Sequence, residues 1–175
     1  MSATRERAAY SDGVAERFRV VPAAYVLLRR GDEVLLQLRE GTGFMDGHWA
    51  LAAAGHVEDG ESVYDAGCRE AHEELGVTVD PADLVPLTSM HRTQLNGRSI
   101  DERVDWFFTC VRWTGEPVLQ EPDKAADLGW FALDSLPAPV VPHELMVLTR
   151  LRSGNVPPIV TFGFSPAPPL PSFAM

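Results

Sequence analysis

The chain contains only two cysteines, Cys68 and Cys110, among its 175 residues. Neither belongs to a Cys-x-x-Cys pair or a Cys/His cluster, so the sequence predicts no zinc site and two reduced thiols. Positive charge is also scarce, because 15 Lys and Arg residues oppose 25 Asp and Glu residues and leave a formal net charge of −10. Nonspecific binding to nucleic acid or to an anionic membrane requires clustered Lys and Arg, so we expect neither partner. An acidic ligand would be attracted locally, by metal ions and a few arginines.

Long apolar runs are missing as well. No stretch approaches the ~18–20 apolar residues of a transmembrane helix. The opening segment MSATRERAAYSDG lacks the apolar region of a signal peptide. We therefore expect a cytoplasmic protein. A length of 175 residues suits one domain with a full core and is too short for two.

The most informative segment runs from Gly55 to Val77 and reads GHVEDGESVYDAGCREAHEELGV. It matches the pattern G-x5-E-x7-R-E-U-x-E-E-x-G-U, where U is a bulky aliphatic residue, and Ala71 is its one undersized residue. At an average residue usage of about 6%, the invariant letters coincide by chance at roughly 3 × 10⁻⁹ of starting positions. Chance does not explain such a match in one short chain.

The same segment predicts a helix over about Val63–Leu75. The Ser62 hydroxyl can cap the backbone N–H of Asp65, whose carboxylate can reach back to Ser62. Gly76 can adopt the left-handed conformation that ends a helix without a Cβ clash. At ~100° per residue, three glutamates fall within an arc of about 100° on one face, namely Glu70, Glu73 and Glu74.

Three carboxylates on one helix face have two interpretations. On an exposed face, like charges at i, i+4 cost only ~0.2–0.5 kcal/mol, so the face needs no ligand. In a cleft, pairs ~5.5 Å apart repel by roughly 3 kcal/mol at an effective dielectric near 20, and a divalent cation would remove that cost. Oxygen ligands without Cys or His select Mg²⁺ or Mn²⁺. The complete motif favours the metal site.

The segment resembles the Nudix box of the Nudix hydrolase superfamily, whose members cleave diphosphate linkages. The resemblance implies that the metal-binding and catalytic carboxylates are Glu70, Glu73 and Glu74. It implies a further metal ligand in the backbone carbonyl of Gly55, and Glu70 is also a candidate general base. It implies a structural ion pair between Arg69 and Glu61. The family commonly has Pro-Gly-Gly before the box, whereas this chain has Ala53 and Ala54 before Gly55.

Four residues outside the box are further candidates. The segment WTGEPVLQEPDKAADLGWFAL resembles the part of MutT-type members that brings another glutamate to the metals. Glu121 is the match and Glu116 a weaker candidate, and the alternative is an ordinary loop acid. Arg39, beside a Gly-rich loop, is the candidate for binding substrate phosphate. Trp49, at the other end of that loop, is the candidate for stacking on a base.

Strand and helix signals along the chain predict an α+β fold. The expected strands lie at Val20–Leu28, Glu33–Leu38, Leu84–Gln94, Arg98–Trp113 and Leu128–Leu133, and a second helix lies at His143–Arg152. Trp49–Ala53 leads into the box. Two turns are expected, at Arg30-Gly31-Asp32 and at Asn96-Gly97. The mixture suits a mixed sheet between helices, the α/β/α sandwich that the resemblance implies.

The chain is expected to divide into an N-terminal arm at 1–19, a domain at 20–155 and a Pro-rich tail at 156–175. The tail carries six prolines and reads as polyproline II or irregular structure. Its phenylalanines, Phe162, Phe164 and Phe173, would dock on the same molecule or on the second subunit of a homodimer.

These features predict a Mg²⁺-dependent hydrolase that splits the diphosphate of a small-molecule nucleotide. The foremost reaction is cleavage of a nucleoside triphosphate to a monophosphate and pyrophosphate, with water as nucleophile. Hydrolysis of a nucleotide sugar stays open, as does a non-catalytic nucleotide sensor on the same fold. Sensors of the family often lose box glutamates, and this chain keeps them. An isopentenyl diphosphate isomerase is disfavoured, because its cysteine motif is not recognisable near Cys68 or Cys110.

Overall fold

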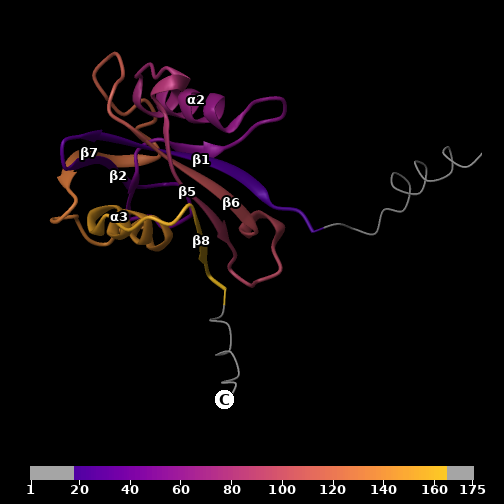
Figure 1. The fold of residues 1–175 in the computed structure, drawn as a ribbon. Coiled ribbons are helices and arrows are strands. Elements are labelled where there is room, and N and C mark those ends of the chain that lie inside the picture. Colours follow the sequence, from indigo (N-terminus) through magenta and orange to yellow (C-terminus); the bar gives the residue numbers. More distant parts are fainter. Residues whose placement is uncertain (1–17, 165–175) are drawn as a thin grey trace, which may run out of the picture.

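The computed structural model describes residues 18–164, and in it a mixed β-sheet lies between two helices (Figure 1). The strands are β1 (Val21–Arg30), β2 (Glu33–Arg39), β3 (Trp49–Leu51), β4 (Ala54–His56), β5 (Val85–Arg92), β6 (Arg103–Cys110), β7 (Ala125–Ala132) and β8 (Ile159–Phe162). The helices are α2 (Val63–Leu75) and α3 (Pro142–Ser153), with 3₁₀ turns at Pro81–Asp83 and Ser99–Asp101.

The sheet order is β3-β2-β1-β6-β5-β8, with β4 paired to β1 and β7 paired to β2. The pairs β1/β6 and β5/β8 are parallel and the others are antiparallel, so the sheet is mixed as predicted. Figure 1 shows α2 above the sheet and α3 below it. The α/β/α sandwich predicted from the sequence is therefore confirmed.

The two faces of β1 show where the core lies. Alternate residues point to opposite faces of a strand. Ala24, Val26 and Leu28 accordingly join the apolar cluster under α2. Ala23, Tyr25 and Leu27 join the cluster on the α3 face. Because both faces are covered, β1 reads as a nearly continuous apolar run rather than an alternating one.

Helix α2 has the limits predicted from its two ends. The backbone N–H of Asp65 donates to Ser62 Oγ at 3.2 Å, and the backbone N–H of Ser62 donates to Asp65 Oδ2 at 3.2 Å. Gly76 ends the helix in the left-handed conformation, with φ of 69°. Small residues let the helix sit close to the sheet, because a Cβ on Gly67 would lie 3.1 Å from Val26 Cγ2.

The tail requires a correction. The prediction of polyproline II or irregular structure is wrong for Ile159–Phe162, which form β8 parallel to β5. The strand is secured at its start, where the Ser89 N–H donates to the carbonyl of Pro158 at 2.9 Å. Val160 is buried on the α3 face of the sheet. Phe173 and the arm at 1–17 lie outside the described residues.

The turn at Asn96-Gly97 is also wider than a two-residue hairpin. Strand β5 ends at Arg92 and β6 begins at Arg103, so the strands are antiparallel neighbours joined by a longer loop. The loop contains the 3₁₀ turn Ser99–Asp101, and Gly97 has φ of 73°. The short turn at Gly31 is confirmed, because Arg30 pairs with Glu33 across it.

Candidate active site

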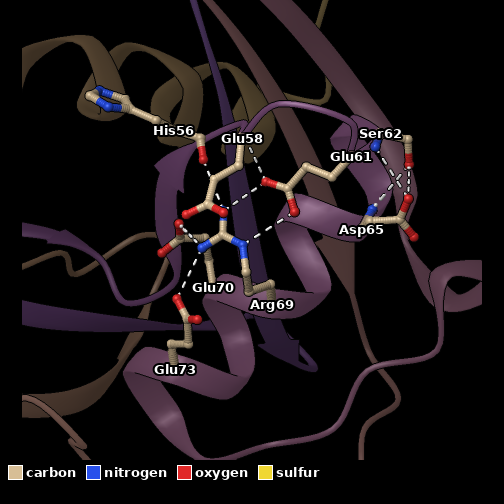
Figure 2. Close-up of polar contacts among 8 residues, drawn as sticks. All are labelled: His56, Glu58, Glu61, Ser62, Asp65, Arg69, Glu70 and Glu73. Atoms are coloured by element: carbon tan, nitrogen blue, oxygen red, sulfur yellow. Dashed lines mark hydrogen bonds and ion pairs between the residues drawn. The ribbon is translucent and has the colours of Figure 1, made fainter.

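Arg69 connects the loop between β4 and α2, called the box loop below, with the face of α2 that carries Glu70, Glu73 and Glu74 (Figure 2). Its Nη2 lies 2.8 Å from Glu61 Oε1, so the ion pair that the resemblance implied is present. The same nitrogen donates to the backbone carbonyl of His56 at 2.9 Å. Nη1 lies 2.7 Å from Glu70 Oε1 and 2.9 Å from Glu73 Oε2. These partners, with Glu61 the strongest, raise the pKa of Arg69, which therefore stays charged and fixes the loop to the helix.

Glu70 lies directly against Gly55, the first residue of the motif. A Cβ placed on Gly55 would overlap the Glu70 carboxylate, so any larger residue at position 55 would displace it. Burial raises the pKa of Glu70, and the adjacent Arg69 opposes that shift. The spacing of the motif thus corresponds to a physical contact between its first residue, Gly55, and its central carboxylate, Glu70.

Glu74 is more deeply enclosed than Glu70. Its Oε2 accepts a hydrogen bond of 2.8 Å from the backbone N–H of Ala54. Burial raises its pKa to about 8, and the negative charges of Glu70 and Glu121 act in the same direction. Glu73 differs, because its side chain is 54% exposed and turns toward Arg69. The helix therefore presents two half-buried carboxylates and one at the surface.

The loop that carries Glu121 returns to the end of α2. The backbone N–H of Gln120 donates to the Glu74 carbonyl at 3.0 Å, which brings the next residue to the acidic face. The charge of Glu121 raises the pKa values of both Glu70 and Glu74, so the three carboxylates interact. Glu121 also forms an ion pair of 2.8 Å with Lys124. The weaker candidate Glu116 is exposed.

The donor set fits a hard divalent cation. Burial and, after it, the negative charge of Glu121 raise the pKa values of Glu70 and Glu74, and a cation between these carboxylates would relieve their repulsion. Across residues 18–164, no three Asp, Glu, His or Cys side chains are already grouped as metal ligands. Arg69 and the Ala54 N–H hold Glu70 and Glu74 instead.

A cavity of about 500 Å³ opens beside β4. Its lining includes Ala54 and Gly55, the β4 residues that contact Glu74 and Glu70, whereas the glutamates themselves are not among the lining residues. The predicted phosphate-binding residue Arg39 lines it, with Nε donating to the Phe44 carbonyl at 2.8 Å and Nη2 to Thr42 Oγ1 at 2.9 Å.

Trp49 lies elsewhere. It packs edge-on against Phe131, with ring centroids 4.7 Å apart, and is not among the residues that line the cavity. Its position gives no support to the predicted stacking on a base.

The α3 side of the cavity carries polar groups that sequence reasoning missed. Glu144, in the first turn of α3, accepts a 2.5 Å hydrogen bond from the Leu51 N–H, and burial raises its pKa to about 8. His143 Nε2 lies 3.3 Å from the Tyr25 hydroxyl. Burial holds the pKa of His143 well below its ordinary value, and Arg92 adds to the effect. The only signal in the sequence was a polar pair directly after Pro142, where a helix begins.

A second group lies where β5 ends and β6 begins. It joins two arginines near the predicted hairpin, which the sequence suggested could assist in binding phosphate but did not single out, to Asp105, which sequence reasoning missed. Asp105 is fully buried, and its two carboxylate oxygens accept hydrogen bonds from Arg92 Nε at 2.8 Å and Arg103 Nε at 3.2 Å. Arg103 Nη1 also lies 2.6 Å from Nε2 of His56, the residue after Gly55. The signal for this group was an aspartate inside the apolar run VDWFF.

Comparison with known proteins identifies the family of this chain. The family model described as the NUDIX domain matches residues 19–151, so the chain belongs to the NUDIX family. Across the part of the chain that is described, no helix is both long and apolar enough to cross a membrane.

Individual relatives are similar over most of this chain. A MutT NUDIX hydrolase from Burkholderia pseudomallei has a crystal structure with a TM-score of 0.68 and 30% identity, covering 76% of this chain and 98% of that one. The NAD-capped RNA hydrolase NudC of Stutzerimonas stutzeri is 32% identical over 76% of this chain and 45% of its own length. The 8-oxo-dGDP phosphatase NUDT18 of Mus musculus is 31% identical over 72% of this chain and 36% of its own length. This chain therefore spans less than half of either curated relative.

Proposed function

We propose that the chain catalyses Mg²⁺-dependent hydrolysis of the diphosphate linkage in a nucleoside diphosphate derivative, foremost of a nucleoside triphosphate to a monophosphate and pyrophosphate. One observation carries the proposal. The carboxylates of Glu70 and Glu74 meet β4 at Gly55 and Ala54, and this part of β4 lines the cavity. A phosphate chain that entered the cavity would therefore pass beside the acidic site.

The residues of the acidic site have different roles in the proposed hydrolysis. Glu70, Glu74 and Glu121, with the Gly55 carbonyl, would hold the cation. Mg²⁺ supplies positive charge that stabilises the phosphate oxygens as the linkage breaks and makes water more acidic. Glu70 is the candidate base for the proton of the attacking water, because burial has raised its pKa toward the operating range.

Two arginines assist in different ways. Arg69 holds the carbonyl of His56 and Oε1 of Glu70, and so positions the box loop against α2. Arg39 has no partner for Nη1 among residues 18–164, and it lines the cavity. A guanidinium with a free N–H edge suits a phosphate oxygen. Arg39 is therefore our candidate for orienting the phosphate chain.

The named activities of the relatives widen the range of substrates to be tested. NudC is named for NAD-capped RNA, and NUDT18 for 8-oxo-dGDP. The net charge of −10 argued against nonspecific nucleic acid binding, but it does not argue against one capped RNA end held at the site. Nucleotide sugars are the remaining class of substrate to be tested.

The test is a panel of nucleoside triphosphates, 8-oxo-dGDP, NAD, NAD-capped RNA and nucleotide sugars, each incubated with Mg²⁺ and separated by chromatography. We expect a monophosphate and pyrophosphate from a triphosphate. A diphosphate and orthophosphate would place the cut at the other linkage and contradict the proposed reaction. Saturable binding of the panel without turnover would support the sensor instead.

A further inference from the structure

The cavity beside β4 has a positive lining in an acidic protein. The formal net charge of the chain is −10, with 15 Lys and Arg residues in all. Four of its arginines nevertheless line this one cavity, namely Arg39, Arg92, Arg98 and Arg103. Arg98 is largely exposed and pairs with Asp101 at 3.7 Å. The lining also contains Glu144, whose pKa burial raises to about 8, so at neutral pH the other three arginines supply most of the charge that a bound ligand would meet.

Arg92 and Arg103 share a single carboxylate. Their side chains are 6% and 11% exposed, and Asp105 between them is fully buried. One negative charge balances only one of the two guanidinium groups, so this Arg92–Asp105–Arg103 cluster carries a net charge of +1. Charges in such an enclosed place interact more strongly than at the surface, because less water screens them. An unbalanced positive charge there favours an anion.

The cluster also has unused hydrogen-bond donors. Only Nε of Arg92 is bonded among the described residues, which leaves its two terminal nitrogens. On Arg103, Nε and Nη1 are engaged and Nη2 is left. None of these three nitrogens is sealed from solvent, and both residues line the cavity. The forked donors of arginine match the oxygens of a phosphate or a carboxylate.

We propose that the Arg92–Asp105–Arg103 cluster binds an anionic group of the substrate, a phosphate or a carboxylate, in addition to the diphosphate at Glu70 and Glu74. This inference rests on the proposed function and narrows its substrate class. The substrate is a nucleotide derivative that carries a further negative charge outside the linkage that is cut. Arg92, Arg103 and Gly55 line the same cavity, so one ligand in it could contact both the cluster and β4.

The first test measures anion binding without turnover. Inorganic phosphate is titrated into metal-free protein while NMR follows the Nε–Hε signals of Arg92 and Arg103, which are assigned by their loss in Arg92→Met and Arg103→Met. Acetate is titrated in parallel and distinguishes a phosphate site from a carboxylate site. We expect a saturable shift of the Arg103 signal that weakens about tenfold in Arg92→Met, the scale of one charged hydrogen bond.

Arg92→Met and Arg103→Met should both fold, because Asp105 retains one arginine partner in each single variant. Arg152→Met removes an exposed arginine at the end of α3 and should leave phosphate affinity unchanged. Asp105→Asn raises the charge of the cluster and should tighten phosphate binding. The inference is overturned if neither arginine signal shifts saturably with either anion, or if Arg92→Met and Arg152→Met bind as the parent does.

The second test compares matched substrates with Mg²⁺. NADP carries one more phosphate than NAD, and adenosine 3′-phosphate 5′-triphosphate one more than ATP. We expect kcat/KM about tenfold higher for the phosphorylated member of one pair, with that ratio falling toward one in Arg92→Met. Equal kcat/KM within both pairs overturns the anion site but does not contradict the proposed hydrolase function. No hydrolysis of any nucleotide overturns the proposed function, and the phosphate titration then decides the inference alone.

Discussion

Glu74 accepts a hydrogen bond of 2.8 Å from the backbone N–H of Ala54, and this bond joins helix α2 to strand β4. The family commonly has a glycine where this chain has Ala54. The donor here is the backbone N–H, which alanine supplies as well as glycine does. Ala53 is completely buried beside it. The alanines therefore leave the contact between the two elements in place.

The carboxylates of α2 should be essential for turnover. Glu70→Gln and Glu74→Gln should each lower kcat at least ~10²-fold, the low end of general-base contributions. Activity should also require Mg²⁺ or Mn²⁺. Steady-state kinetics on the best substrate, with and without excess EDTA, check both points. Full turnover in EDTA would contradict the metal requirement.

Gly55→Ala should act through Glu70. The added Cβ would overlap the Glu70 carboxylate, so the side chain must move and kcat should fall at least about tenfold. A double-mutant cycle separates this from a general loss of structure. In a Glu70→Gln background, Gly55→Ala should have a much smaller effect on kcat. Equal effects in both backgrounds would show that Gly55 acts independently of Glu70.

Glu121→Gln tests the carboxylate from the separate loop. The variant should need more Mg²⁺ for half-maximal activity and turn over more slowly, because a hard cation prefers charged oxygen ligands. Its Tm should change little, since Lys124, which is largely exposed, is the only ion-pair partner of Glu121 among residues 18–164. The matched control is Glu116→Gln, at an exposed position of the same loop. A Mg²⁺ dependence and kcat equal to the parent's would make Glu121 an ordinary surface acid.

The pKa of Glu144 predicts how stability depends on pH. Burial raises it from 4.5 to about 8, so the folded protein keeps this proton at pH values where the unfolded chain has lost it. Stability from this group is complete below pH 4.5 and is lost as pH rises through about 8. The depressed pKa of His143 acts in the opposite direction and only below about its ordinary value of 6.5.

The measurement is the Tm of metal-free protein between pH 7 and pH 9. The parent should lose several degrees more over this range than Glu144→Gln, which keeps an acceptor for the Leu51 N–H but cannot ionise. The exposed variant Glu40→Gln should behave as the parent does. Parallel pH curves for the parent and Glu144→Gln would mean that Glu144 does not titrate in this range.

Strand β8 should contribute to stability. Val160 is 6% exposed and Ile159 is 70% exposed, so two neighbouring apolar residues provide a matched pair. Val160→Ala should lower the free energy of unfolding by roughly 1–3 kcal/mol, as expected for removing buried methyl groups. Ile159→Ala should change it by less than about 0.5 kcal/mol. Chemical denaturation of the two variants checks the difference.

Local signals in the sequence predicted much of the fold. Ser62 and Gly76 determined the ends of α2, because a cap and a left-handed glycine act within a few residues. Strand β8 escaped prediction because Pro157 and Pro158 precede it and nothing nearby shows that β5 is its partner. Tertiary pairing, rather than local propensity, makes that segment a strand.

The site was also predictable only in part, because tertiary contacts bring some of its residues together. The box spacing placed the glutamates on one helix face and paired Arg69 with Glu61. It did not predict that Glu144 would bond to Leu51, 93 residues earlier in the chain. Nor did it distinguish Arg92 and Arg103 among the arginines near the hairpin, since their shared partner Asp105 is brought between them only by the pairing of β5 with β6.

The parallel pairing of β8 with β5 bears on how the protein is produced for study. The family match ends at residue 151, whereas the sheet continues to Phe162. An expression fragment trimmed to the family match would leave β5 with an unpaired edge and uncover apolar surface on the α3 face. Exposed strand edges pair with other chains. Such a fragment should aggregate during purification, and activity lost in it would report on solubility rather than on catalysis.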